Sequence, residues 1–287
     1  MPRSLLWPDP RVKPPFGSVE LDRGHPLARG LVGYWLFNEG GGPLALDLAG
    51  ANIGTLTNGP TWVSGRAGPA LNFDGVNDYV DAGAAANFTS EGFTLALWIN
   101  FDTLDGTGED GNPVLFNKGQ FEVDGYYLQS QDAVNRNLVL VTNQSAANQQ
   151  TKSSNNTLSL GDWQHLVATR SGATVKLYRN GVEVSYASTG THIDPASTTS
   201  NSVIGRYLPS AANFHVNGLI DDVRVYNRAL SAVEVLQFFL EPYAMLRPIV
   251  RRRYFVAPVA AGAGAHGAMY PRMQRHVHQS WTVPRIG

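Results

Sequence analysis

The strongest hydrophobic pattern in this chain lies between residues 93 and 101, where apolar side chains occupy every second position. The members of this repeat are Phe93, Leu95, Leu97, Ile99 and Phe101. A period of two over this length predicts an extended strand with one face buried. Stretches of the same character occur at 163–170, 174–179, 203–206 and 216–226, so we expect many short strands joined by turns.

Two local motifs refine this prediction. Asn180-Gly181 lies between two apolar runs, and both residues tolerate positive φ, so the pair predicts a two-residue hairpin turn. Ser231 and Glu234 have the spacing of a capping box, which predicts a helix that ends before Pro242. Its buried side is expected to carry Val233, Leu236, Phe239 and Leu240.

Strands with almost no helix favour an all-β sandwich over an α/β fold. We expect this sandwich to span residues 31–241. Residues 1–30 contain six prolines and no sustained period, which predicts an extended N-terminal arm. Residues 242–287 lose the pattern after Pro242 and predict a second, C-terminal arm.

Charge divides the chain in the same way. Residues 31–241 hold ten Lys/Arg and twenty Asp/Glu, whereas residues 242–287 hold seven arginines and no acid. A basic arm beside an acidic body predicts docking on an acidic protein surface; the acidic body argues against nucleic acid as the partner. Cysteine is absent, which excludes a disulfide scaffold and thiol catalysis. Neither a secretory signal nor a membrane span is expected.

Three stretches carry a family resemblance, namely 31–42, 68–80 and 218–231. Together with the strand at 93–101 and the Asn180-Gly181 hairpin, they resemble in order the laminin-G-like, concanavalin A-like lectin/glucanase superfamily. The resemblance covers residues 31–240 and implies a jelly-roll sandwich of two antiparallel sheets. It leaves function open, because this fold hosts lectins, hydrolases, adhesion modules and inert spacers.

The arms carry a second resemblance. Residues 22–35 and 241–248 are similar to virion-associated proteins of tailed bacteriophages. This implies a non-enzymatic capsid decoration protein or tail-surface subunit at the virion surface, made in the host cytoplasm. Its partners would be further copies of itself, as in a trimer, and a viral capsid or tail protein. The residues expected to dock are Arg247, Arg251, Arg252, Arg253, Tyr254, Phe255, Arg272, Arg275 and Trp281.

Catalysis is not expected. Glucanases of the superfamily use a Glu-x-Asp-x-x-Glu strand whose outer carboxylates do the chemistry. This chain has Glu122 and Asp124 at the first two positions but Tyr127 at the third. One outer carboxylate is therefore missing, and a degenerate glucanase is the third alternative. His165 lies in a predicted strand and is more typical of a core histidine than of a general base.

The resemblance also implies a structural Ca²⁺ ion. Asp221 matches the aspartate that family members supply from the last long strand, and Asn38 and Gly75 lie in the expected partner turns. Ca²⁺ takes six to eight oxygen ligands, which such turns can donate. The alternative is that Asp74, Asn77 and Asp78 only form a tight turn with Asx hydrogen bonds.

A carbohydrate-binding adhesin or lectin module is the runner-up function. Tryptophan side chains can stack on sugar rings, and the segment 143–156 is rich in Asn, Gln and Ser. Trp98 and Trp163 lie in predicted strands and are more typical of the core. The glycan-binding candidates are therefore Trp62, Asn143 and Asn156.

Overall fold

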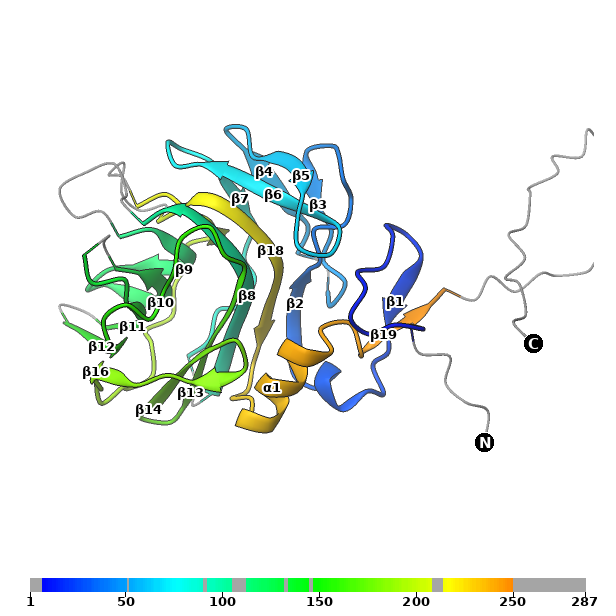
Figure 1. Cartoon of the computed structure of the whole chain (residues 1–287). Coiled ribbons are helices and arrows are strands. Elements are labelled where there is room, and N and C mark those ends of the chain that lie inside the picture. Colours follow the sequence, from blue (N-terminus) through cyan, green and yellow to red (C-terminus); the bar gives the residue numbers. More distant parts are fainter. Residues whose placement is uncertain are drawn as a thin grey trace, which may run out of the picture. The chain divides into compact units, whose positions relative to one another are not determined.

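Two antiparallel sheets face each other across a shared apolar core (Figure 1). A computed structural model of the chain describes residues 7–50, 52–89, 92–104, 112–131, 134–144, 147–207 and 214–249. Within these residues the nine-stranded sheet has the spatial order β16 (Tyr186–Ser188), β12 (Ala147–Ser153), β11 (Leu138–Gln144), β10 (Asp124–Ser130), β9 (Val114–Gln120), β17 (Ser202–Ile204), β7 (Tyr79–Asp81), β4 (Gly54–Thr57) and β3 (Leu44–Ala45).

The eight-stranded sheet is built around two long central strands, β8 and β18. Its order is β15 (Val182–Glu183), β14 (Thr174–Arg179), β13 (Gln164–Ser171), β8 (Gly92–Thr103), β18 (Asn217–Tyr226), β6 (Pro69–Asp74) and β5 (Thr61–Ser64), and β2 (Leu31–Trp35) also pairs with β18. The predicted jelly-roll sandwich is thus confirmed. The strand ranges expected from the sequence agree with those of β8, β13, β14, β17 and β18 to within a few residues.

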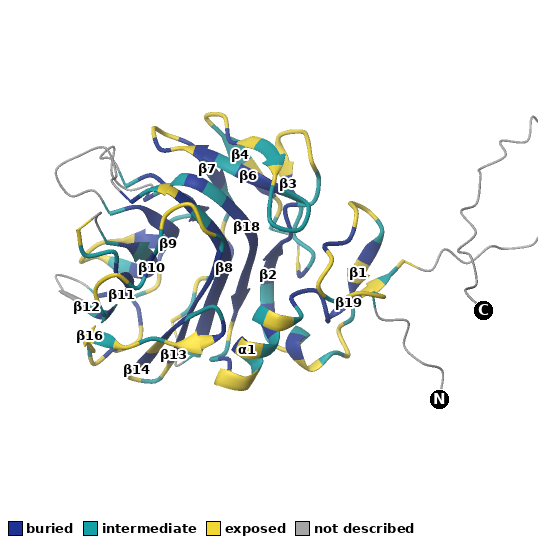
Figure 2. Ribbon diagram, viewed as in Figure 1, coloured by how far each residue is buried: buried dark blue, intermediate teal, exposed yellow. Residues whose placement is uncertain are grey.

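The core lies between the two sheets, as the central strands in Figure 2 show by their dark colour. All five apolar members of the 93–101 repeat belong to it, which confirms the predicted inward face of β8. The nine-stranded sheet contributes alternate residues such as Tyr126, Leu128 and Leu140. Because strand side chains alternate, Tyr127, Gln129 and their neighbours face away from this core.

A second apolar cluster covers the outer face of the eight-stranded sheet. It joins Ala96, Val167 and Tyr226 of that sheet to residues from both ends of the described chain. At those ends, β1 (Val19–Leu21) pairs with β19 (Leu246–Pro248), and a short 3₁₀ turn spans Pro26–Ala28. Val19, Leu21 and Leu27 are buried. In its described part, residues 7–30, the segment expected as an extended N-terminal arm therefore packs these apolar residues on the sandwich.

The compact body of the protein extends beyond the boundary expected at residue 241. Tyr243, Met245 and Leu246 are buried in the second cluster, and the compact unit extends to Ile249. The remainder of the predicted C-terminal arm, 250–287, lies outside the described residues.

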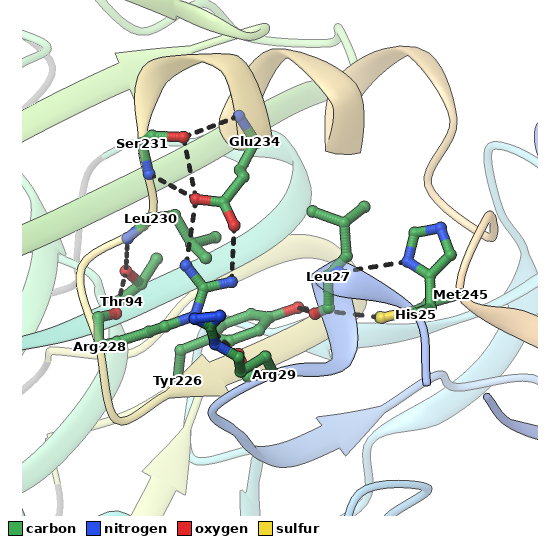
Figure 3. Close-up of polar contacts among 10 residues, drawn as sticks. All are labelled: His25, Leu27, Arg29, Thr94, Tyr226, Arg228, Leu230, Ser231, Glu234 and Met245. Atoms are coloured by element: carbon green, nitrogen blue, oxygen red, sulfur yellow. Dashed lines mark hydrogen bonds and ion pairs between the residues drawn. The ribbon is translucent and has the colours of Figure 1, made fainter. Parts of the chain in front are cut away.

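The helix α1 (Ala232–Leu240) begins with the predicted capping box, in which Ser231 and Glu234 exchange hydrogen bonds (Figure 3). Arg228 adds two hydrogen bonds to Glu234, at 3.0 and 2.7 Å. Three of the four residues predicted for the buried side, Val233, Leu236 and Leu240, are exposed. The fourth, Phe239, is half-buried and stacks on Trp98, and the fully buried residues are Val235 and Phe238. In the part of the chain that the structure describes, no helix has the length and apolar character needed to cross a membrane.

Candidate functional site

A cleft of about 510 Å³ lies on the side of the nine-stranded sheet that faces away from the core. Strands β9, β10 and β12 supply its floor, because every second residue of each strand points to this side. The described lining consists of Asn112, Val114, Gln120, Phe121, Tyr127, Gln129, Gln131, Gln150, Tyr207 and Phe214. Aromatic and amide side chains therefore dominate the cleft.

The aromatic residues of the cleft pack edge to face. The ring of Tyr207 lies 5.8 Å from that of Tyr127, at 65°, and 5.6 Å from that of Phe214, at 82°. The backbone N–H of Phe121 donates to the Tyr207 hydroxyl at 2.6 Å, which ties the β9–β10 turn to the ring. Burial raises the pKa of both Tyr127 and Tyr207, so their hydroxyls stay protonated at neutral pH.

Apart from the two tyrosine hydroxyls, the polar groups of the described lining are all side-chain amides, contributed by one asparagine and four glutamines. Amide groups both donate and accept hydrogen bonds without carrying charge. Gln131 is the most informative of them, because its Oε1 is buried and has no hydrogen-bond partner among the described residues. A buried acceptor of this kind requires a partner such as water or a ligand hydroxyl.

The carboxylates suspected of catalysis are not part of this lining. Glu122 lies in the β9–β10 turn, with φ of 57°, and Asp124 accepts a hydrogen bond from the backbone of Gln120 at 2.9 Å. His165 is buried against Trp98, at 5.1 Å between ring centroids, and burial lowers its pKa to about 3. Glycoside hydrolysis needs two opposed carboxyl groups. The described lining of the cleft supplies none.

The three residues suggested by the sequence for glycan binding lie elsewhere. Trp62 packs on Phe37 in the eight-stranded sheet and donates to Gly42 O at 2.8 Å. Asn143 is buried and donates to Asp124 O at 3.1 Å, and Asn156 occupies a turn with φ of 60°. The signal that points to the cleft is the spacing of two between Tyr127 and Gln129 in β10 and Gln131, which directly follows that strand.

The aspartate suggested for calcium is bound to a lysine. The Lys13 ammonium contacts Asp221 Oδ1, and it also donates to Phe37 O at 2.9 Å and to Pro69 O at 2.6 Å. Both side chains are excluded from solvent, with exposures of 0% for Lys13 and 1% for Asp221. Burial raises the pKa of Asp221 to about 7, and the Lys13 ammonium opposes that shift.

The other two calcium candidates do not join this arrangement. The Asn38 side chain donates to Pro14 O at 3.0 Å, although the carbonyl just before it, on Phe37, does face the cation. Gly75 follows the far end of β6, in a turn closed by the expected Asx hydrogen bond from Val76 N to Asp74 Oδ1 at 2.8 Å. Among the described residues, no three His, Cys, Asp or Glu side chains gather as a metal site. With Lys13 on Asp221, the residues present do not fit a resident Ca²⁺ ion.

Of the residues expected to dock on a partner, only Arg247 falls in the described part of the chain. It lies on β19 and forms an exposed ion pair with Glu20 at 2.9 Å. Arg251, Arg252, Arg253, Tyr254, Phe255, Arg272, Arg275 and Trp281 lie outside the described residues.

Comparison with solved structures shows that the fold is shared with domains of binding proteins and of carbohydrate-active enzymes. The binding domain of Paraclostridial mosquitocidal protein 1 superposes with a TM-score of 0.57 at 19% identity, over 74% of this chain and 52% of that chain. Domain 4 of AbnA, a GH43 extracellular arabinanase from Geobacillus stearothermophilus solved in complex with arabinotriose, superposes with a TM-score of 0.53 at 19% identity. The match covers 77% of this chain and 98% of that domain. The sialidase of Trypanosoma rangeli superposes with a TM-score of 0.53 at 20% identity, over 74% of this chain and 33% of the sialidase.

These identities establish similarity of fold alone, and the chain spans only about half of the mosquitocidal binding domain, 52% of its length. No curated protein matches the sequence. The family model described as the concanavalin A-like lectin/glucanases superfamily matches residues 74–236, more than half of the chain. The matched range includes most of both sheets and all three strands that form the floor of the cleft, β9, β10 and β12. This chain therefore belongs to the concanavalin A-like lectin/glucanases superfamily.

Proposed function

We propose that this protein is a carbohydrate-binding module that holds a neutral oligosaccharide in the cleft of the nine-stranded sheet. The observation that carries this proposal is the described lining, which combines four aromatic rings with five amide side chains. The cleft volume of about 510 Å³ lies within the usual range for small-molecule sites.

The chemistry of the lining suits a sugar. Aromatic side chains present large apolar faces on which the C–H face of a pyranose or furanose ring can pack. Amides placed beside them can donate to and accept from sugar hydroxyls, which fixes orientation. The unpartnered Oε1 of Gln131 is an acceptor for one such hydroxyl. Domain 4 of the arabinanase AbnA, which shares the fold, was solved with arabinotriose.

Charge narrows the class of sugar. Within the described lining there is no acidic or basic side chain, so an acidic sugar would leave its carboxylate without a cation. Neutral saccharides are therefore the proposed ligands. The same lining provides no pair of carboxylates for hydrolysis, which favours binding over turnover.

A glycan array of neutral and acidic oligosaccharides is the first experiment, followed by calorimetry on each hit. We expect binding to neutral members and no hydrolysis of laminarin or lichenan by the same preparation. Release of reducing sugar that Glu122→Gln abolishes would overturn the binding-only proposal. Absence of binding to any glycan would overturn the proposed function itself.

Two matched variants locate the site. Gln150→Ala removes a lining amide, whereas Gln149→Ala changes the neighbouring residue on the opposite face of β12. Only the first is expected to weaken binding, by about tenfold, the size of one lost hydrogen bond. Trp62→Ala tests the residue that the sequence suggested; loss of binding there, with Gln150→Ala silent, would move the site to the eight-stranded sheet.

The virion structural role stays a prediction from the sequence. Apart from Arg247, the residues expected to dock on a partner lie outside the described part of the chain. A carbohydrate-binding module is compatible with a particle-surface location. Deleting residues 250–287 tests the docking role separately, since the proposed cleft uses none of them.

A further inference from the structure

The hydrogen-bond partners of the buried Lys13 ammonium among the described residues are three oxygen atoms. Two backbone carbonyls, Phe37 O and Pro69 O, and the carboxylate of Asp221 surround it. These groups come from three separate segments of the eight-stranded sheet region: the segment after β2, the start of β6 and the middle of β18. We propose that this pocket is a cation site that the chain fills with its own ammonium group in place of a divalent metal ion.

The oxygen set supports this proposal chemically. Backbone carbonyls and a carboxylate at one point are hard donors, the kind that Ca²⁺ takes in proteins. Asp221 Oδ2 is buried and has no partner among the described residues, so the carboxylate keeps a second oxygen available. Phe37 O, Pro69 O and the two carboxylate oxygens of Asp221 give four oxygen donors. If the Lys13 side chain is shortened, waters in the space that it leaves would complete the six or more ligands that Ca²⁺ needs.

Two backbone features adjoin the Lys13 ammonium and its side chain, the positive φ of Phe37 and the glycine at position 68. Phe37 has φ of 52°, a conformation that bulky residues rarely adopt, and its carbonyl is one of the three acceptors. Gly68 allows the lysine to reach the pocket: a Cβ at this position would lie 3.1 Å from Lys13 Cδ. The Lys13 charge also acts on Glu39, where it opposes the rise that burial causes in that carboxyl's pKa.

Unlike a bound metal ion, the Lys13 ammonium is covalently attached to the chain. Lys13 belongs to the N-terminal segment, so its charge also fastens that segment to the sandwich. Two neighbouring hydrogen bonds hold the same segment: the Asn38 side chain donates to Pro14 O, and Tyr243 N donates to Pro10 O. In this arrangement the wild-type protein needs no metal for stability, and removal of the lysine converts the pocket into a metal-dependent one.

Thermal unfolding of the full chain in EDTA and in 10 mM Ca²⁺ tests the proposal. We expect the wild-type midpoint to be the same in both. Lys13→Ala should lower the midpoint in EDTA by roughly 10 °C, because it leaves a buried carboxylate unpaired, and Ca²⁺ should restore much of the loss. If this variant is unfolded in EDTA, recovery of its folded circular dichroism spectrum on addition of Ca²⁺ is the equivalent result.

Two controls make the result specific. Lys176→Met removes an equal charge from a half-exposed ion pair with Glu183 and should not respond to Ca²⁺. Lys13→Ala combined with Asp221→Asn should lose the Ca²⁺ response, because the charged ligand is gone. A Ca²⁺ response of equal size in the wild type, or no response in Lys13→Ala, would overturn the proposal. Both results are independent of any glycan.

Discussion

Asp222 and Arg224 form a two-bond ion pair inside the protein, with Arg224 Nε 2.9 Å from Oδ1 and Nη2 2.7 Å from Oδ2. The pair exists because the register of β18 against β8 shifts between Asp221 and Arg224, where Asp222 takes φ of 55°. The guanidinium also lies over the rings of Tyr34 and Phe238, and it donates to Pro242 O. One bulge thus joins both central strands, α1 and the C-terminal segment.

Asp222→Ala should therefore destabilise the fold strongly. The substitution leaves a fully buried guanidinium without its carboxylate, a change that costs about 3–5 kcal/mol. Urea unfolding at pH 7 measures it. Glu183→Ala is the matched control, because it breaks an exposed pair with Lys176, worth less than about 1 kcal/mol. Equal losses in the two variants would show that the Asp222–Arg224 pair is not the element that holds the bulge.

The helix offers a direct comparison of its two faces. Phe238 is fully buried beside Arg224 and Tyr226, whereas Leu240 is 54% exposed. Phe238→Ala should cost about 3–5 kcal/mol through the cavity it leaves, and Leu240→Ala less than about 0.5 kcal/mol. Denaturant midpoints of the two variants, at unchanged slope, provide the measurement. A larger loss of stability in Leu240→Ala than in Phe238→Ala would instead support the buried side predicted from the sequence.

His192 predicts a loss of stability in mild acid. Its ring lies between the hydroxyls of Thr142 and Thr151, each at 2.9 Å, and burial lowers its pKa to about 4, with Arg170 adding to the shift. The folded protein therefore keeps the ring neutral while the unfolded chain binds a proton below about pH 6.5. Stability falls as pH drops from 6.5 to 4, by up to about 3 kcal/mol.

Comparison with His192→Gln isolates this contribution, since other titrating groups are common to both proteins. The wild-type advantage in unfolding free energy should be constant above pH 7 and should shrink by pH 4.5. If the difference between the two proteins is the same at pH 7.5 and 4.5, His192 does not titrate as the structure indicates.

Much of the fold was predictable because its signals are local. The alternation at 93–101, the Asn180-Gly181 turn and the Ser231–Glu234 box each act within a few residues, and all three are present in the structure. The helix face was not predictable in the same way. Its sequence is apolar on several sides, so the side that is buried depends on Tyr226 and Arg224, which come from β18.

The candidate site was harder to predict because it combines distant segments. The cleft joins β9, β10 and β12 to Tyr207 and Phe214, and strand pairing over such separations leaves no short motif. The Lys13 contact with Asp221 spans 208 positions in sequence. Lys13 contacts both Asp221 and Phe37 O, in the segment after β2, but an isolated lysine among prolines carries no signal of its destination.

If the cleft binds neutral sugars as proposed, its affinity should not depend on pH between 5 and 9. The described lining contains no histidine, acid or base, and burial raises the pKa of Tyr127 and Tyr207 further above this range. Calorimetry at pH 5, 7 and 9 should give dissociation constants within about twofold. An affinity that changes by more than this between pH 5 and pH 9 would mean that a titrating group contacts the ligand, and it would contradict a site made only of the described lining.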